Sequence, residues 1–142
     1  MSHFDEAGIM YADAFAAMHT ACFDKAWDKS TFLSLLMLPT TRGFINSDCF
    51  ILCSVCGTEA EILTLGVLPN ARQKGLGTAL LAHTMAYLKR LGVQDLFLDV
   101  DVKNTPARAL YEKSGFVQVG CRPNYYVSGA EKSDALVLKK KL

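Results

Sequence analysis

Residues 61–78 read EILTLGVLPNARQKGLGT and set the architecture expected for the whole chain. Apolar residues predominate in 61–68, as in a strand. The loop that follows contains Gly75 and Gly77 and leads into a long amphipathic helix that ends at Gly92. The first amides of a helix have no partner within it and carry partial positive charge. This segment therefore predicts a strand, a loop and a helix that together bind an anion, above all a pyrophosphate.

Upstream of this segment the sequence predicts two helices and then an antiparallel meander. Phe15 and His19 belong to a set of residues with helical spacing, and a second short helix is expected at 30–37. The turn sequences 46–48 and 57–58 separate runs that are typical of strands. The strands expected in this part are 42–45, 49–56 and 61–68.

Downstream the pattern alternates between helix and strand. After the helix at 76–91 a strand is expected at 96–102, followed by a short helix that begins at Asn104 or Thr105. Two further strands, 116–127 and 135–139, complete the chain. The whole pattern predicts a mixed α/β fold in one domain, residues 1–142, with a mostly antiparallel central sheet and helices on both faces.

Composition sets the broad class of protein. The chain has 142 residues, of which 51% are hydrophobic and 20% charged, as in an average globular domain. It lacks the roughly 20-residue apolar run of a membrane span, and residues 1–6 do not resemble an export signal. The net charge of +1 gives no reason to expect direct binding to nucleic acid or membrane. These features predict a cytoplasmic protein.

The charges are divided unevenly along the chain. Residues 1–71 hold 3 basic and 8 acidic side chains, whereas residues 72–142 hold 12 and 6. Solvated surface is the simplest interpretation. The alternative is that the basic half binds a polyanion and the acidic half binds a basic acceptor.

The five cysteines predict reduced thiols and no metal site. An odd number cannot pair completely, and Cys49, Cys53 and Cys56 lie in a run typical of a buried strand. Cys53 and Cys56 would point to opposite faces of that strand, and no second C-x-x-C pair exists to complete four ligands. We therefore expect the three thiols to be structural.

The glycine loop fits neither of two common nucleotide motifs. A dinucleotide-binding fingerprint needs a third glycine where this chain has Leu80. The sequence also contains no G-x-x-x-x-G-K-[ST] run, so a Walker loop is excluded.

Two motifs together resemble the GNAT superfamily of N-acetyltransferases. The first is R-x-x-G-x-G at 72–77, and the second is N-x-x-A-x-x-L-Y-x-x-x-G-F at 104–116, which is far more specific. With Cys22-Phe23 and the run RPNYY at 122–126, the chain is similar to the RimI branch, which acetylates the N-terminal alanine of ribosomal proteins. The resemblance implies a sheet that splays at one parallel strand pair. It also implies an enzyme that uses acetyl-CoA and no metal, and that transfers acetyl directly in a ternary complex.

The resemblance also assigns roles to residues. Tyr111 stands at the position of the general acid for the leaving thiolate. Asp99 stands at that of the base, where the branch more often has Glu, so a relay through water is favoured. Glu61 is the competing base, since histone-type members carry theirs on this strand. The cofactor-binding residues implied are Leu65, Val67, Gln73, Lys74, Gly75, Leu76, Gly77, Thr78 and Asn104.

Further expectations concern the neighbours of these residues. Gly66 predicts a bulge or a close approach of another chain segment. Arg72 is expected to add positive charge at the rim of the phosphate loop. Trp27, Tyr125 and Tyr126 could form walls for the acceptor or pack in the core.

Other functions stay open at the level of sequence. The acceptor could be a ribosomal protein N-terminus or a small amine, because the same fold serves both. A non-catalytic module that binds acyl-CoA is a third possibility, favoured only by Asp99 in place of Glu. An acylated Cys22, Cys53 or Cys121 is disfavoured, since no histidine accompanies them by motif. The oligomeric state has no signal in the sequence.

Overall fold

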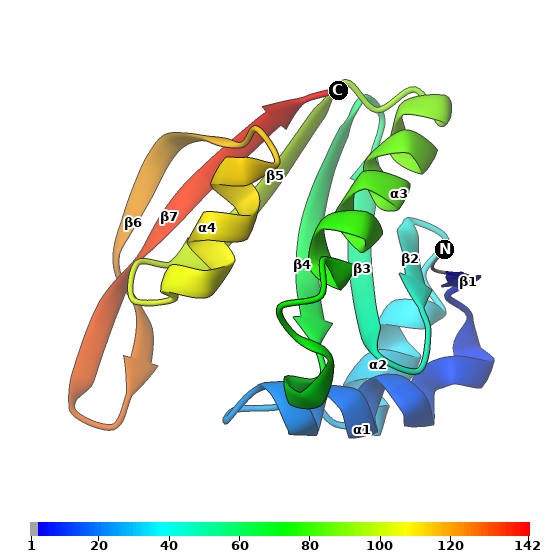
Figure 1. Cartoon of the computed structure of the whole chain (residues 1–142), viewed down its shortest axis with the longest axis horizontal. Helices are drawn as coiled ribbons and strands as arrows, with labels where there is room; N and C mark the ends of the chain where they lie inside the picture. Colours follow the sequence, from blue (N-terminus) through cyan, green and yellow to red (C-terminus); the bar gives the residue numbers. More distant parts are fainter. Residues whose placement is uncertain (1–2) are drawn as a thin grey trace.

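A computed structural model describes residues 3–142 as one seven-stranded sheet flanked by helices (Figure 1). The sheet order is β1-β2-β3-β4-β5-β7-β6. The strands of this described part are β1 (Asp5–Glu6), β2 (Thr41–Ile45), β3 (Cys49–Cys56), β4 (Glu59–Val67), β5 (Asp95–Asp101), β6 (Val117–Ser128) and β7 (Glu131–Lys141). Its helices are α1 (Ala12–Cys22), α2 (Lys29–Leu36), α3 (Leu76–Arg90) and α4 (Thr105–Lys113), with 3₁₀ turns η1 (Ile9–Tyr11) and η2 (Pro69–Ala71).

The pairing of β4 with β5 is parallel, and it is short. The ladder runs from Glu59 opposite Asp95 to Ile62 opposite Leu98, although both strands continue beyond these residues. Figure 1 shows the two strands diverging from there. On the other side of β4 the register with β3 shifts, so that Leu63 is an extra residue. Such a bulge bends and twists a strand, which accounts for the divergence.

The helices pack on opposite faces of the sheet. Ile51 of β3 belongs to the larger core cluster, together with Leu80 and Leu88 of α3. The next residue back, Phe50, points to the other face and packs with Phe15 of α1 and Phe32 of α2. This alternation is the period of two that a strand imposes.

The expected fold class is confirmed, including the single parallel pair and its splay. Strand β3 has the predicted bounds, whereas α2 begins one residue earlier than the expected range 30–37. The Asp28 carboxylate accepts a hydrogen bond from the amide of Thr31 at 2.9 Å, and this cap fixes the start at Lys29. The two-residue strand β1 and the 3₁₀ turns were not expected, because such short elements leave no periodic pattern.

Three further expectations concern the N-terminus, membrane-spanning helices and the cysteines of β3. Met1 and Ser2, which begin the stretch compared with an export signal, lie outside the described residues. In residues 3–142 every helix is too short or too polar to cross a bilayer. Cys49 and Cys53 are buried as expected, but Cys56 is exposed because it ends β3 beside the turn at Gly57.

Candidate active site

The divergence of β4 and β5 leaves main-chain groups without a strand partner. The amide of Leu68 donates to the carbonyl of Asp48 at 2.8 Å. Because hydrogen-bonded and non-hydrogen-bonded pairs alternate along an antiparallel ladder, the next pair, Val67 and Cys49, is not hydrogen-bonded. By the same alternation, Leu65 and Val67 turn their amide and carbonyl groups away from β3. They point to the side where β5 has already separated. Both residues are among those that the resemblance assigned to cofactor binding.

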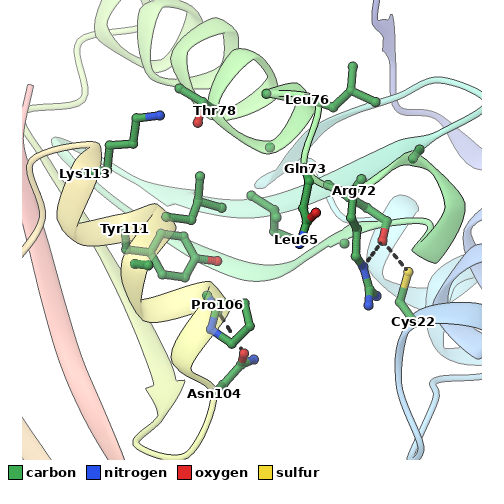
Figure 2. Close-up of a pocket in the computed structure, with 18 of the residues that line it drawn as sticks. Cys22, Leu65, Arg72, Gln73, Leu76, Thr78, Asn104, Pro106, Tyr111 and Lys113 are labelled. Carbon is green, nitrogen blue, oxygen red and sulfur yellow. Dashed lines mark hydrogen bonds between the residues drawn. The ribbon is translucent and has the colours of Figure 1, made fainter.

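A cavity of about 830 Å³ opens on the face of α3 and α4 (Figure 2). The β4 end, the glycine loop and α4 all contribute to its wall. Eight of the nine residues expected to bind the cofactor line it: Leu65, Val67, Gln73, Gly75, Leu76, Gly77, Thr78 and Asn104. The ninth, Lys74, is exposed and is not part of the wall. The structure brings in another cation, Lys113 of α4, which the sequence reasoning missed.

The glycine loop has the backbone of an anion-binding turn. Gln73 and Gly75 both have positive φ, at 64° and 80°, and α3 begins directly after them. The first helical bond is donated by Ala79 to the carbonyl of Gly75 at 3.0 Å. The amides of Leu76, Gly77 and Thr78 precede that bond and are free to face a ligand. A loop in which φ alternates in sign, next to a helix N-terminus, directs main-chain amides toward phosphate oxygens.

Arg72 is exposed and lines the 830 Å³ cavity beside the glycine loop, and its side chain also bonds back to β4. Its Nε donates to the carbonyl of Val67 at 2.8 Å, and the Cys22 thiol approaches the same oxygen at 3.5 Å (Figure 2). The guanidinium therefore ties the loop to the end of β4. Burial raises the pKa of the Cys22 thiol, although Arg72 opposes that effect, so the thiol is protonated at neutral pH.

Gly66 marks a close approach. A Cβ added there would lie 2.5 Å from Cζ of Phe50, so any larger residue would displace that ring. The predicted alternatives at this point were a bulge and a close approach. Both features exist, but the bulge falls three residues earlier, at Leu63.

A second cavity, of about 530 Å³, lies on the face of α1. The connection between α1 and α2 forms one wall, through Phe23, Asp24 and Trp27, and β5 forms another. Six residues line both this cavity and the larger one: Cys22, Phe23, Leu65, Asn104, Ala107 and Tyr111. The two cavities therefore meet at the gap between β4 and β5. A long molecule entering from one face could meet a second molecule entering from the other.

Tyr111 stands where the cavities meet. It is 7% exposed, its ring packs edge-on against Phe116 at 5.5 Å, and its hydroxyl is directed from α4 into the larger cavity (Figure 2). Burial, and to a lesser extent the neighbouring Cys53 and Tyr126, raise the pKa of this phenol well above its usual value. The hydroxyl is thus protonated at neutral pH and can donate.

The two candidate bases lie in one small cavity of about 320 Å³, lined by Glu61, Phe97 and Asp99. Asp99 also lines the 530 Å³ cavity, with Tyr111, whereas Glu61 does not. An Asp99 oxygen lies 3.4 Å from Nε of Arg122, and the Asp99 side chain is 17% exposed. Sequence reasoning placed Arg122 in a motif but did not foresee this ion pair, which depends on β6 reaching across β7.

Aromatic and polar residues complete the second cavity. Trp27 and Tyr126 line it, whereas Tyr125 lies outside it, 54% exposed, with Arg122 at 5.7 Å from its ring centre. Burial, and then Asp99, raise the pKa of Tyr126 to about 12. Asn104 caps α4 by accepting from the amide of Ala107 at 3.3 Å, and it lines both large cavities. The cap and the cavity position predicted for it therefore coexist.

The residues present fit acetyl-CoA in shape and chemistry. The unpaired main-chain groups of Leu65 suit an extended amide-bearing arm, and the loop suits a pyrophosphate. Space also exists at the loop, because a Cβ on Gly75 would meet nothing within 4 Å. Among residues 3–142, no three His, Cys, Asp or Glu side chains gather as they would around a metal ion.

Comparisons with known proteins agree with this geometry. The family model "Acetyltransferase (GNAT) family" matches residues 13–116. The [ribosomal protein bS18]-alanine N-acetyltransferase of Escherichia coli K12 is 37% identical over 118 residues, which cover 79% of this chain and 78% of that protein. The crystal structure of the ribosomal-protein-S18-alanine N-acetyltransferase from E. coli superposes with a TM-score of 0.90 at 27% identity, covering 99% and 94% of the two chains. Arabidopsis thaliana NAA60 in complex with acetyl-CoA shares the fold, with a TM-score of 0.84 at 18% identity over 99% and 98%.

Proposed function

Since the chain belongs to the acetyltransferase (GNAT) family, we propose that it moves an acetyl group from acetyl-CoA to the N-terminal α-amine of a protein. The proposed acceptor is the N-terminal alanine of a small-subunit ribosomal protein. The relatives named above support this choice, since their names give an alanine of ribosomal protein bS18 as the acceptor. In this role the protein acts in the cytoplasm.

One observation carries the proposal: the ladder between β4 and β5 ends at Ile62 and Leu98, and cavities on both faces meet beyond it. This arrangement gives the donor and the acceptor separate entrances and a common meeting point. A chain end can enter the 530 Å³ cavity with its α-amine leading toward that meeting point.

The donor is held by the glycine loop and β4 in this proposal. Main-chain amides from Gln73 to Thr78 bind the pyrophosphate, with Lys113 nearby as a counter-charge. Lys74 adds its charge from the solvent side. The free amide and carbonyl of Leu65, the free amide of Val67 and the Asn104 side chain position the pantetheine arm. Acetyl-CoA supplies the acetyl thioester and its thiol leaving group.

The chain's own groups then handle the protons. A chain-terminal amine has an ordinary pKa of about 8, so a weak base suffices to keep it neutral. Asp99 serves as that base through a water molecule, because it lines the acceptor cavity and its side chain is short. Tyr111 remains protonated because of its burial, and it donates to the departing sulfur. A main-chain amide of the splayed β4 segment stabilises charge on the carbonyl oxygen.

Purified protein, acetyl-CoA and a peptide beginning with alanine test the proposal by mass spectrometry. The expected product gains one acetyl group at the α-amine. The matched control is the same peptide with a blocked N-terminus and one internal lysine, which should stay unmodified. Ribosomal proteins from a strain lacking the gene should show one N-terminus without its acetyl mass. Turnover of a polyamine or another small amine, with none of the peptide, would contradict the proposed acceptor.

A further inference from the structure

His19 of α1 is a buried polar residue that the reaction scheme does not use. It is 3% exposed, and its ring stacks on Phe23 at 4.4 Å and on Trp27 at 5.0 Å. Phe32 and Phe50 close the cage from α2 and β3, at 5.4 and 5.8 Å. An imidazole in such surroundings needs hydrogen-bond partners for both nitrogens.

Both ring nitrogens have partners, and one of them fixes the proton. The backbone amide of Trp27 lies 3.0 Å from Nδ1. Because an amide can only donate, Nδ1 is the acceptor and carries no proton. The proton of the neutral ring is therefore on Nε2, which donates to the hydroxyl oxygen of Thr64 at 3.1 Å.

These two bonds join distant parts of the active site. Trp27 belongs to segment 23–28, which connects α1 to α2 and lines the 530 Å³ cavity. Thr64 is on β4, directly after the Leu63 bulge and next to Leu65. His19 thus ties the acceptor-side wall to the strand that faces the donor. The same segment has a second tether, from Lys25 Nζ to the carbonyl of Val127 in β6.

We propose that His19 is a positioning residue for the acceptor: as the neutral ring with its proton on Nε2, it anchors segment 23–28 against β4 at Thr64. Protonation of Nδ1 would remove the acceptor of the Trp27 amide and release the segment. The inference rests on the proposed function, since it takes the 530 Å³ cavity as the acceptor's site.

The electrostatic surroundings agree with a neutral ring. In residues 3–142 no ion pair involves His19, although the cavity holds other ionisable groups: Cys22, Asp24, Lys25, Asp99, Asp101, Tyr111 and Tyr126. Asp28 is the N-cap of α2, and its carboxylate accepts from the amide of Thr31. Burial lowers the pKa of His19 below its usual value. The anchored state is thus favoured at neutral pH.

The chain provides its own probe for the anchor, because Trp27 is its only tryptophan. A protonated imidazole quenches the fluorescence of an indole on which it stacks. In the wild-type protein we expect the emission to fall as the pH drops, with a midpoint below the ordinary histidine value of about 6.5. His19→Phe and His19→Asn should lack this step. A midpoint at or above that value would overturn the proposal.

Steady-state kinetics of the same variants separate a role of His19 in positioning the acceptor from a purely structural role. His19→Phe keeps the stacked ring but loses both hydrogen bonds, so the KM for an alanine-initiated peptide should rise about tenfold. The KM for acetyl-CoA and kcat should change by less than about twofold. His19→Asn, whose side-chain oxygen can accept from the Trp27 amide near the Nδ1 position, should recover most of the loss. Thr64→Val should give an intermediate rise, and it serves as the test if His19→Phe does not fold.

These outcomes distinguish a failure of the positioning role of His19 from a failure of the proposed acetyltransferase function. A peptide KM that is equal in wild type, His19→Phe and Thr64→Val overturns the positioning role. If no peptide is acetylated at any pH, the proposed function fails. The tryptophan titration would then still decide whether the neutral ring anchors segment 23–28.

Discussion

Ile62 and Leu98 are the last residues paired in the parallel ladder between β4 and β5. One residue later, Leu63 forms a bulge against β3. The main-chain groups of Leu65 then face a gap that reaches both sides of the sheet, with Tyr111 lining it from α4. In the proposed function, this gap is where the donor, the acceptor and Tyr111 meet.

Gly75→Ala should weaken acetyl-CoA binding. An alanine at φ 80° carries a strain of about 1–2 kcal/mol and distorts the turn that presents the amides of α3. Gly57→Ala is the matched control, because Gly57 also has positive φ (61°) and open space around it, but lies in the β3–β4 turn. Calorimetry should show similar losses of unfolding free energy for both variants, and a fall in acetyl-CoA affinity for Gly75→Ala alone. Equal affinities would argue against the loop as the phosphate site.

Tyr111→Phe should lower kcat by about 100-fold or more and leave both KM values nearly unchanged. The ring, which packs on Phe116, is retained, and only the proton donor is lost. Tyr87→Phe, at a half-buried position on α3 outside the described cavities, is the control and should keep kcat within about twofold. Steady-state rates provide the measurement. Undiminished turnover of Tyr111→Phe would remove its assigned role.

Asp99→Asn and Glu61→Gln form a pair that locates the base. Both residues line the 320 Å³ cavity, but only Asp99 also lines the 530 Å³ cavity proposed for the acceptor. We expect kcat to fall about tenfold or more for Asp99→Asn, and to change by less than about twofold for Glu61→Gln. The loss should shrink at mildly alkaline pH, where the peptide amine is already neutral. The reverse ranking would assign the base to Glu61.

Folding stability should depend on pH through His19. Its pKa is lowered in the folded state by burial, so the folded protein binds fewer protons than the unfolded chain near pH 6. The unfolding free energy should therefore be unaffected by this group above about pH 6.5, and should fall as the pH drops below it. Urea unfolding at several pH values should show a shallower decline for His19→Asn. Parallel curves for the two proteins would contradict this assignment.

Much of the fold follows from local sequence. A mostly apolar run bounded by turn residues sets β3, and Asn104 with Pro106 set the start of α4. Eight of the nine residues that the motifs assigned to cofactor binding also line one cavity. The remaining features depend on contacts between distant segments. Arg72 turning back to Val67 and His19 bridging Trp27 to Thr64 have no local pattern, because their partners are chosen by packing.

The Asp99–Arg122 ion pair and the residues around the two large cavities also depend on contacts between distant segments. The sequence gives no sign that Arg122 reaches Asp99, because the two residues are on strands separated by β7. Lys113 was missed for a different reason, since lysine at a helix C-terminus is ordinary. A buried histidine among apolar residues was a usable signal for His19, because both its nitrogens require partners.

The meeting of donor and acceptor between β4 and β5 can be observed in a crystal structure of the chain with a bisubstrate analogue. The analogue is coenzyme A joined through acetyl to the amine of an alanine-initiated peptide. We expect the pyrophosphate on the amides of 73–78 and the pantetheine arm along Leu65, between β4 and β5. The linking carbonyl should lie beside Tyr111, and the peptide should lie in the cavity walled by segment 23–28. A peptide bound on another surface, or an arm that does not pass between the two strands, would contradict this arrangement.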